Sequence, residues 1–256
     1  MQIYVCVKHV PDTAAKISVA GDAGFAETCK FVANPYDEYA VEEAVRLVEK
    51  AGSGEVIAVT LGKEAALNTL RSVLAQGADR GILIKTDAQF MDSRIVSQAL
   101  KRAIEQDGSP DLIFTGKQSV DSEGMQTHFR LAEAFGMPAV TNVVGFSVQN
   151  GKAVVECESG GADRIVVEMG MPCVVGATRG LNQPRYPKLP DIMKARKKPI
   201  KQVDLQNLGI NPSQPHSQLI KLEAVPERAQ AKLLPGSIPQ AVKELVRVLK
   251  EEEKIL

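Results

Sequence analysis

The stretch TGKQSVDSEGMQT, residues 115–127, has the features of a phosphate-binding loop. It begins at the end of an apolar run and shows no periodicity until a helical pattern starts, so it is longer than a plain connection requires. Unpaired backbone N–H groups at a helix start, together with the helix dipole, favour an anion. Gly116 and Gly124 allow close approach of the backbone, and Gln126 and Thr127 add side-chain donors. These residues predict a site for the phosphate of a nucleotide.

A long helix cap explains the same residues, with Asp121 or Ser122 satisfying the helix start. The local sequence leaves both interpretations open. Other predicted strand ends favour the nucleotide site, because ligands of open α/β sheets bind beyond the carboxyl ends of the strands. These ends are residues 6–8, Asn34-Pro35 and Leu61-Gly62. The lysine at position 8 could face a phosphate there, although a lysine in such a place is often simply solvated.

Catalytic patterns are missing from the sequence. His9, His128 and His216 lie at no metal-ligand spacing and suggest no Ser/His/Asp arrangement. Residues 159–164, SGGADR, resemble the phosphate loop of ATP pyrophosphatases, but they fall in an expected hairpin and end in arginine. Neither a P-loop nor a dinucleotide fingerprint is present. Nucleotide binding is therefore favoured over an ATP-hydrolysing or adenylating activity.

The elements that would position this site alternate between strands and helices, which indicates an α/β fold with a parallel sheet. The expected strands are residues 3–7, 56–61, 81–84, 112–115, 140–148, 154–157, 165–167 and 173–177. The early ones are nearly continuous apolar runs, as in sheets covered on both faces. The strands at 154–157 and 165–167 flank a glycine-rich turn and predict an antiparallel hairpin.

Four helices are expected between the strands. Asn34 can cap the first, which has Asp37 in its positive first turn. The second follows Gly62, and the third spans 91–105. The fourth follows Gly124. Its predicted inner face consists of Met125, Phe129, Ala132 and Phe135.

The composition changes after residue 186, where prolines interrupt a stretch without strand alternation. We therefore expect a nucleotide-binding α/β domain at 1–186, followed at 187–256 by a docking loop and an extended arm. The arm ends in a helix that begins with a capping box, Ser237 and Gln240, and carries an apolar stripe. Such an arm needs another surface on which to pack.

The net charge and composition of the chain limit the classes of partner that it could bind. The formal net charge is zero, aromatic residues make up 4% of the chain and tryptophan is absent, which disfavours nucleic acid and anionic membranes. The four cysteines form no close pair and predict reduced thiols. No secretion signal and no apolar run of membrane-spanning length is present. We expect a soluble, cytoplasmic protein.

One further segment suggests docking. Residues 181–190, LNQPRYPKLP, hold a leucine in a proline-rigid loop, and a basic run follows at 193–201. An apolar anchor beside positive charge is typical of a transient docking site. A solvated basic face is the simpler alternative.

Taken together, these motifs resemble the beta subunit of electron transfer flavoproteins over essentially the whole chain. The likeness rests on VCVKHVPDT, NPYDEYAVEEAVRL, QGADRGI, GKQSVDSEGMQT and LNQPRYPKLPDIMKARKK. The resemblance implies a heterodimer with an alpha subunit and a Rossmann-like fold similar to the adenine-nucleotide alpha hydrolases. It also implies an electron carrier rather than an enzyme, with one FAD carried mainly by alpha and a structural AMP in beta. The matching AMP positions are Cys6, Asn34, Leu61, Gly116, Asp121, Ser122, Glu123, Gly124, Met125, Gln126 and Thr127.

The resemblance also assigns the docking segment. Leu189 matches the leucine of a recognition loop that inserts into acyl-CoA dehydrogenases of fatty acid oxidation, and the adjacent basic run would steer an acidic partner. The other partner-docking residues are Arg185, Tyr186, Lys194, Arg196 and Lys197. Electrons would continue to a respiratory acceptor, a membrane quinone oxidoreductase. Glu158 resembles a glutamate that positions the flavin domain, although the hairpin here is one residue shorter.

Two alternatives remain. One branch of the family holds a second FAD in beta and bifurcates electrons from NADH. The sequence Gln126-Thr127 is closer to the AMP-binding form, whereas His128 departs from both patterns. A solitary nucleotide-sensing domain would share the fold, but it would have no use for the arm or for Leu189.

Overall fold

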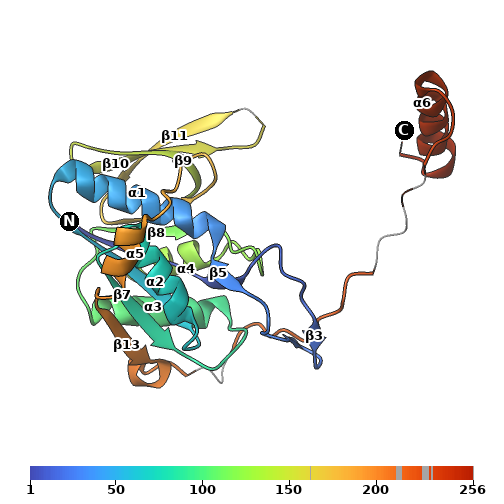
Figure 1. Cartoon of the computed structure of the whole chain (residues 1–256). Coiled ribbons are helices and arrows are strands. Elements are labelled where there is room, and N and C mark those ends of the chain that lie inside the picture. Colours follow the sequence, from blue (N-terminus) through green and yellow to red (C-terminus); the bar gives the residue numbers. More distant parts are fainter. Residues whose placement is uncertain (162, 212–214, 227–230, 232, 256) are drawn as a thin grey trace. The chain divides into compact units, whose positions relative to one another are not determined.

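The structure is a computed structural model that describes residues 1–161, 163–211, 215–226, 231 and 233–255. Its contacts divide the chain into two units, Met1–Leu222 and Glu223–Leu256 (Figure 1). One residue of the predicted hairpin turn, Ala162, and several residues of the predicted arm lie outside the described residues.

The described part of the first unit is built on a nine-stranded sheet with the order β11-β10-β9-β12-β8-β1-β6-β7-β13. Its strands are β1 (Gln2–Cys6), β6 (Glu55–Gly62), β7 (Arg80–Lys85), β8 (Leu112–Gly116), β9 (Ala139–Gln149), β10 (Lys152–Glu158), β11 (Arg164–Gly170), β12 (Cys173–Ala177) and β13 (Ile200–Asp204). The strands from β9 to β13 in this order run parallel, whereas β10 pairs antiparallel with both β9 and β11. The predicted α/β fold with a parallel sheet and a terminal hairpin is confirmed.

The strand order reverses at β1. The chain proceeds from β1 to β6 and β7 on one side, and β8 then pairs with β1 on the other. In open α/β sheets such a reversal opens a crevice at the carboxyl ends of the two strands. The switch point therefore lies between Cys6 and Gly116, the last residues of β1 and β8.

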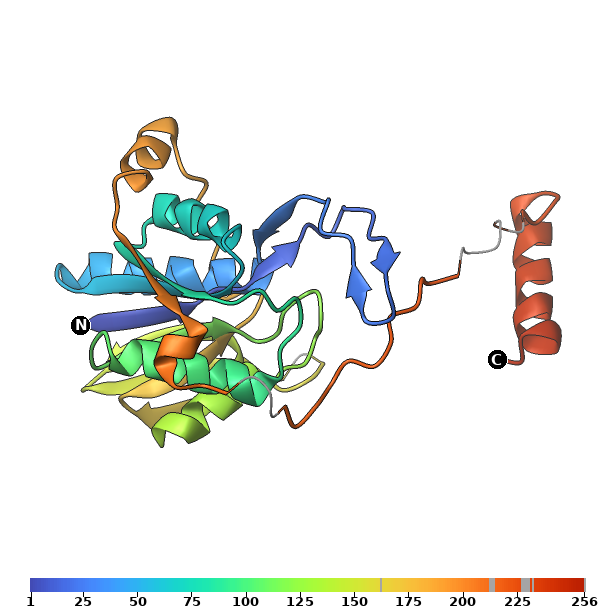
Figure 2. The ribbon, with the colours of Figure 1, turned by 90° about the horizontal axis from the view of Figure 1, so that it is seen from below.

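Helices cover both faces of the sheet (Figure 2). Helices α1 (Pro35–Ala51) and α2 (Ala66–Gln76) lie on one face, and α3 (Ser93–Glu105) and α4 (Thr127–Phe135) lie on the other. Along β1, Ile3 and Val5 face the first core and Tyr4 and Cys6 the second. This two-sided burial explains why β1 reads as a continuous apolar run.

A small lobe follows β1. Strand β2 (His9–Pro11) pairs with β5 (Phe31–Ala33), and β3 (Val19–Ala20) pairs with β4 (Gly24–Phe25). These short strands were not predicted, since none is long enough to show periodicity. They hold the segment between β1 and α1 beside the switch point.

Two predictions about elements were wrong. Helix α4 begins at Thr127, and its buried face consists of His128, Leu131 and Ala132, while Phe129 is exposed. Its inner face is therefore rotated relative to the prediction, because the polar His128 occupies a core position. The stretch after 186 does contain a strand, β13 at the sheet edge, where only Ile200 and Val203 are half-buried and alternation is too weak to detect.

The second unit contains α6 (Ile238–Arg247) and a π-helical turn, η2 (Val248–Glu252). The predicted capping box is confirmed, because Gln240 Oε1 accepts hydrogen bonds from Ser237 N at 2.9 Å and Ser237 Oγ at 3.1 Å. Ile238, Val242 and Leu245 remain exposed. None of the helices in the described ranges combines the length and apolar character that crossing a bilayer demands.

Candidate nucleotide site and docking surface

The carboxyl ends of β1 and β8 are joined by one buried side chain, Asp37 in the first turn of α1. Its Oδ2 accepts a hydrogen bond from Lys8 N at 2.7 Å, and its Oδ1 accepts one from Gly116 N at 2.9 Å. A third donor is Asn34 Nδ2, 2.9 Å from Oδ1. Burial raises the pKa of Asp37 to about 7, although these donors act in the opposite direction.

Gly116 is required by this junction. A Cβ at this position would lie 2.3 Å from Asp37 Oδ1 and 2.7 Å from Tyr36 Cβ. The close backbone approach predicted here therefore occurs, but it is made by the start of α1. Gly124 differs, because in the part of the chain that the structure describes nothing beyond its two chain neighbours lies within 4 Å of the place where its Cβ would be.

Asn34 is almost completely buried and does not cap α1, contrary to the prediction. Its Nδ2 donates to Asp37 and also to Gln118 O at 2.9 Å. Its Oδ1 accepts from Val120 N at 3.1 Å. The side chain thus supports the loop after β8, while Pro35 takes the first helical position as its fixed φ favours.

The side chain of Lys8 is not simply solvated. Its Nζ lies 2.7 Å from Asp121 Oδ1 and within 3.4 Å of the Ser119 and Ser122 hydroxyls. The two hydroxyls are 2.9 Å apart. A cation therefore sits against the predicted phosphate loop, balanced by the carboxylate of Asp121.

Residues 121–126 form an exposed loop before α4. Glu123 and Met125 have φ values of 49° and 51°, which are uncommon for residues with side chains and concentrate at functional sites. Gln126 precedes the helix but forms no side-chain bond to the first helical amides. Its Oε1 instead accepts hydrogen bonds from Arg130 Nε at 2.9 Å and from Ser93 Oγ at 3.1 Å.

The remaining predicted contacts lie at different depths. Cys6 is buried at the end of β1, where burial raises the pKa of its thiol, and Leu61 is half-buried near the end of β6. Thr127 is half-buried at the first position of α4. All four cysteines are free, as predicted. The structure brings the predicted site residues to one edge of the sheet, with the loop exposed and Cys6, Asn34 and Gly116 beneath it.

His128 has an unusual environment. The side chain is buried, its Nε2 has no hydrogen-bond partner among the described residues, and its ring lies 4.2 Å from that of Phe129 between centroids. Burial lowers its pKa to about 4. Within the described ranges, no three metal-ligating side chains cluster in a way that could hold an ion.

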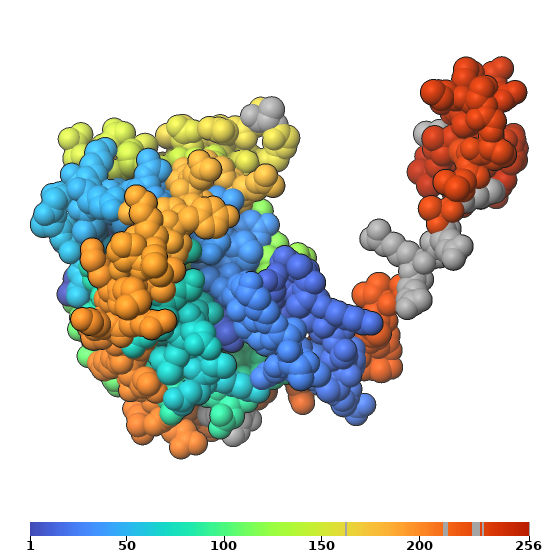
Figure 3. All heavy atoms as spheres, viewed as in Figure 1, coloured from blue at the N-terminus to red at the C-terminus, as the bar shows by residue number. Residues whose placement is uncertain are grey.

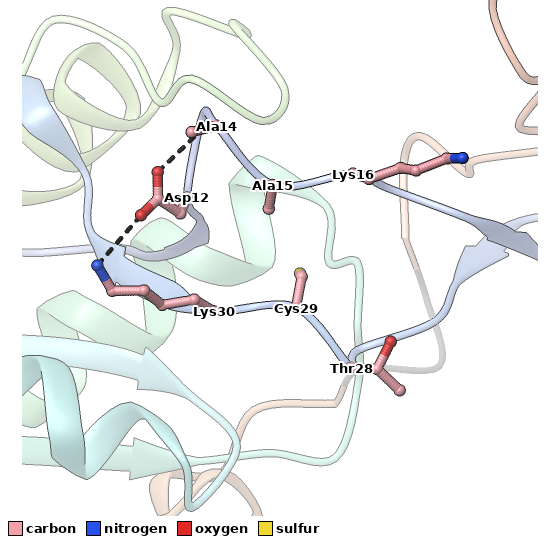
Figure 4. A pocket seen from close by; sticks show the side chains of 7 residues that line it. All are labelled: Asp12, Ala14, Ala15, Lys16, Thr28, Cys29 and Lys30. Atoms are coloured by element: carbon pink, nitrogen blue, oxygen red, sulfur yellow. Dashed lines mark hydrogen bonds and ion pairs between the residues drawn. The ribbon is translucent and has the colours of Figure 1, made fainter.

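Two hollows lie in the small lobe. One, of about 340 Å³, includes Phe25, Phe90 and Asp121 in its lining and so adjoins the predicted loop. The other, of about 390 Å³, is shallow and lies between Asp12 and Lys30, which form an ion pair at 3.2 Å (Figure 4). The second hollow contains none of the predicted site residues.

The predicted docking segment forms a helix, α5 (Leu189–Ala195), that packs on α2. Figure 3 shows this segment, in orange, at the surface over the teal α2. Leu189 is 73% exposed and Tyr186 is 96% exposed, with Ile192 and Met193 beside them. We refer to these four residues as the Leu189 patch.

Some basic side chains of this segment are exposed, whereas others form hydrogen bonds with the rest of the fold. Lys194, Arg196 and Lys197 are exposed, as a docking role requires. Lys198 Nζ instead donates to Leu74 O at 2.9 Å and Ala78 O at 2.6 Å, and so anchors α5 to the end of α2. Arg71 in α2 reciprocates by donating to two carbonyls at the end of α5.

Arg185 is also committed to the fold. Its guanidinium donates to Glu42 at 2.9 and 3.1 Å and to Glu49 at 2.6 and 3.0 Å, both on α1. These carboxylates raise the pKa of Arg185. The predicted docking role of Arg185 stays a prediction, and the structure adds an anchoring role. Glu158 is exposed at the end of β10, opposite Arg164 in the hairpin.

The sequence interpretation missed the central role of Asp37. It treated Asp37 as a favourable charge in a helix N-terminus. The sequence feature that could have revealed this role is the position of Asp37, three residues after Asn34 at a predicted strand end. A short carboxylate there can reach backbone amides. The partners themselves lie 29 and 79 positions away and could not be read locally.

The fold and the edge site define a Rossmann-like α/β protein with a mostly parallel sheet, and comparison with known proteins identifies its family. A family profile described as "Electron transfer flavoprotein domain" matches residues 22–208. The chain is 36% identical over 260 residues to the "Electron transfer flavoprotein subunit beta" of Bacillus subtilis, with both chains covered completely. It is also 36% identical over 261 residues to the mouse protein of that name, covering 100% of this chain and 99% of the relative. The corresponding mitochondrial protein of Arabidopsis thaliana matches at 36% over the full length of both.

The chain belongs to the family of electron transfer flavoprotein beta subunits. The resemblance inferred from the motifs is therefore confirmed, and the family's function is electron transfer.

Proposed function

We propose that this chain binds AMP at the edge formed by β1, β8 and the loop before α4, as one half of a heterodimer with an alpha subunit that carries FAD. The observation that carries this proposal is the exposed loop around Gly124. Among the described residues, no atom beyond the two chain neighbours lies within 4 Å of the Gly124 Cβ position, and the side chain of Gln126 does not cap the helix that follows. Free amides at a helix start favour a phosphate.

The charges nearby fit a nucleotide better than a bare anion. Lys8 supplies a cation for the phosphate, whereas Asp121, 2.7 Å from it, would repel one. A carboxylate suits a ribose hydroxyl, which donates a hydrogen bond to it. Binding would therefore transfer Lys8 from Asp121 to the phosphate and leave the carboxylate for the sugar.

The flavin, when bound, supplies the redox chemistry. This chain contributes a scaffold for it: the exposed Glu158 at the hairpin end is proposed to contact the flavin-carrying domain. The family name supports a flavin in the assembly, and the relatives named "subunit beta" support a second subunit.

The Leu189 patch is proposed to dock acyl-CoA dehydrogenases, which donate electrons that pass on to a membrane quinone oxidoreductase. Leu189 projects from the first position of α5, and the capping bond from Lys188 N to Asp191 Oδ2, at 3.2 Å, holds the helix start. Exposed apolar side chains on an anchored helix suit a transient partner, and Lys194 and Arg196 provide steering charge.

Nucleotide identification tests the first part. The heterodimer is purified and denatured, and its nucleotides are identified and counted by mass spectrometry. One FAD and one AMP support the proposal. Lys8→Ala should reduce the AMP content, whereas Lys16→Ala, an exposed lysine of the small lobe, should not. Two FADs together with NADH oxidation would instead place the protein in the bifurcating branch.

Electron transfer kinetics test the second part. Leu189→Ala should slow flavin reduction by a reduced acyl-CoA dehydrogenase and leave nucleotide content intact. Ile220→Ala is the matched control, since Ile220 is 84% exposed elsewhere on the same unit. Equal rates for wild type and Leu189→Ala would remove the patch from the proposed function.

A further inference from the structure

We propose that Asp37 and Asn34 are positioning residues that hold the nucleotide loop in its binding shape without touching the nucleotide through their side chains. This inference rests on the proposed function. It changes the role expected of Asn34, which the sequence interpretation assigned to direct contact.

Both side chains already form hydrogen bonds within the protein, and both amide hydrogens of Asn34 are used. The two hydrogens of Asn34 Nδ2 are donated to Asp37 Oδ1 and Gln118 O, and Oδ1 receives Val120 N. Asp37 receives three N–H donors and is 5% exposed, while Asn34 is 1% exposed. Neither offers a free donor to a phosphate, and neither reaches the surface.

Their contacts fix the backbone on both sides of the loop's first turn. Asp37 holds Gly116 N at the end of β8, and Asn34 holds Gln118 O and Val120 N directly after it. The segment before Asp121 is therefore fastened at three successive points to the start of α1. Asp37 also binds Lys8 N at the end of β1.

The hydrogen bonds of Asp37 and Asn34, which we call the Asp37–Asn34 lock, also position the ammonium group of Lys8. The Lys8 backbone is held by Asp37, and its side chain extends to Asp121, Ser119 and Ser122. One carboxylate thus sets the position of the lysine and, through Asn34, the loop that the lysine faces. A site whose donors are held in place before binding loses less entropy when the ligand arrives.

Loss of the Asp37–Asn34 lock should weaken the binding of the phosphate group more than that of the nucleoside. AMP and adenosine differ only in the phosphate group, so the ratio of their dissociation constants reports the phosphate contribution separately from general stability. Asp37→Asn replaces one acceptor with an amide that faces backbone donors. It should weaken AMP binding about tenfold or more. Adenosine binding should change much less.

The measurement uses the full chain with its alpha subunit, stripped of AMP and titrated with AMP or adenosine by calorimetry. Asp79→Asn is the matched control, because Asp79 Oδ2 accepts a strand amide, Val56 N at 2.8 Å, at the opposite end of the sheet. Asn34→Ala is the second variant, since it removes both loop contacts and leaves Asp37 with its two backbone donors. Asn34→Ala should raise the ratio of the AMP to the adenosine dissociation constant. It keeps the inference testable if Asp37→Asn folds poorly.

Hydrogen exchange gives an independent readout. In Asn34→Ala the amide of Val120 should exchange faster, while that of Ile113 inside β8 keeps its protection. Unchanged AMP affinity in both lock variants, or an equal loss of AMP and adenosine affinity, would overturn the inference. Absence of AMP binding by the wild type would overturn the proposed function first, and the inference with it.

Discussion

Replacing Gly116 with alanine should destabilise the first unit even when no nucleotide is bound. The added Cβ would lie 2.3 Å from Asp37 Oδ1, 2.7 Å from Tyr36 Cβ and 3.0 Å from Asp37 N. Two of these atoms belong to or adjoin the backbone of α1, and the carboxylate is held by its donors, so the neighbours cannot simply rotate away. The helix start must move, or the hydrogen bonds of Asp37 must break.

The cost has two parts. Overpacking a filled interior costs about 1–3 kcal/mol. Displacing the buried Asp37 oxygen from its N–H donors adds about 1–3 kcal/mol. For a unit of this size, Met1–Leu222, each kcal/mol lowers Tm by about 2–4 °C, so the combined cost of about 2–6 kcal/mol should lower Tm by about 4–24 °C.

Gly124→Ala is the control, since its Cβ would meet nothing within 4 Å. Its free energy of unfolding should remain within about 0.5 kcal/mol of the wild type. Thermal and urea unfolding of nucleotide-free protein, followed by circular dichroism, measures both variants. A Gly116→Ala protein as stable as the wild type, or equal losses for both glycines, would refute the packing argument.

Three further predictions concern charged groups. Burial raises the pKa of Asp37 to about 7, whereas its value in the unfolded chain is about 4. The wild type should therefore lose stability relative to Asp37→Asn as pH rises from 4 to 7. Urea unfolding should show a loss of up to about 4 kcal/mol. Burial lowers the pKa of His128 to about 4, so the folded protein should lose stability as pH falls from about 6.5 to about 4. Between these pH values, His128→Leu should unfold at a higher urea concentration than the wild type. A lower midpoint would contradict this. Arg185→Ala leaves the buried Glu42 carboxylate without its partner and should cost about 1–2 kcal/mol, with faster amide exchange at residues 182–187; unchanged exchange would show that the loop is held otherwise.

Much of the fold could be predicted because its signals are local. The apolar runs of β1, β6 and β8 and the helical periodicity between them need only neighbouring residues to be recognised. Strand β13 could not be predicted in this way, since an edge strand buries little. The inner face of α4 was assigned wrongly because His128 occupies a core position without being apolar. Leu189 is exposed, as a surface anchor must be, and its docking role stays a prediction.

The site shows the same division. By itself the sequence determined the α/β order, the family and the segments that meet at one edge of the sheet, since each depends on residue types at short spacing. Only the tertiary structure decided that Gly116 accommodates α1 while Gly124 stays open, and that Asp37 joins two strand ends. Those outcomes depend on strand order and register, which bring together backbone amides that carry no mark in the sequence.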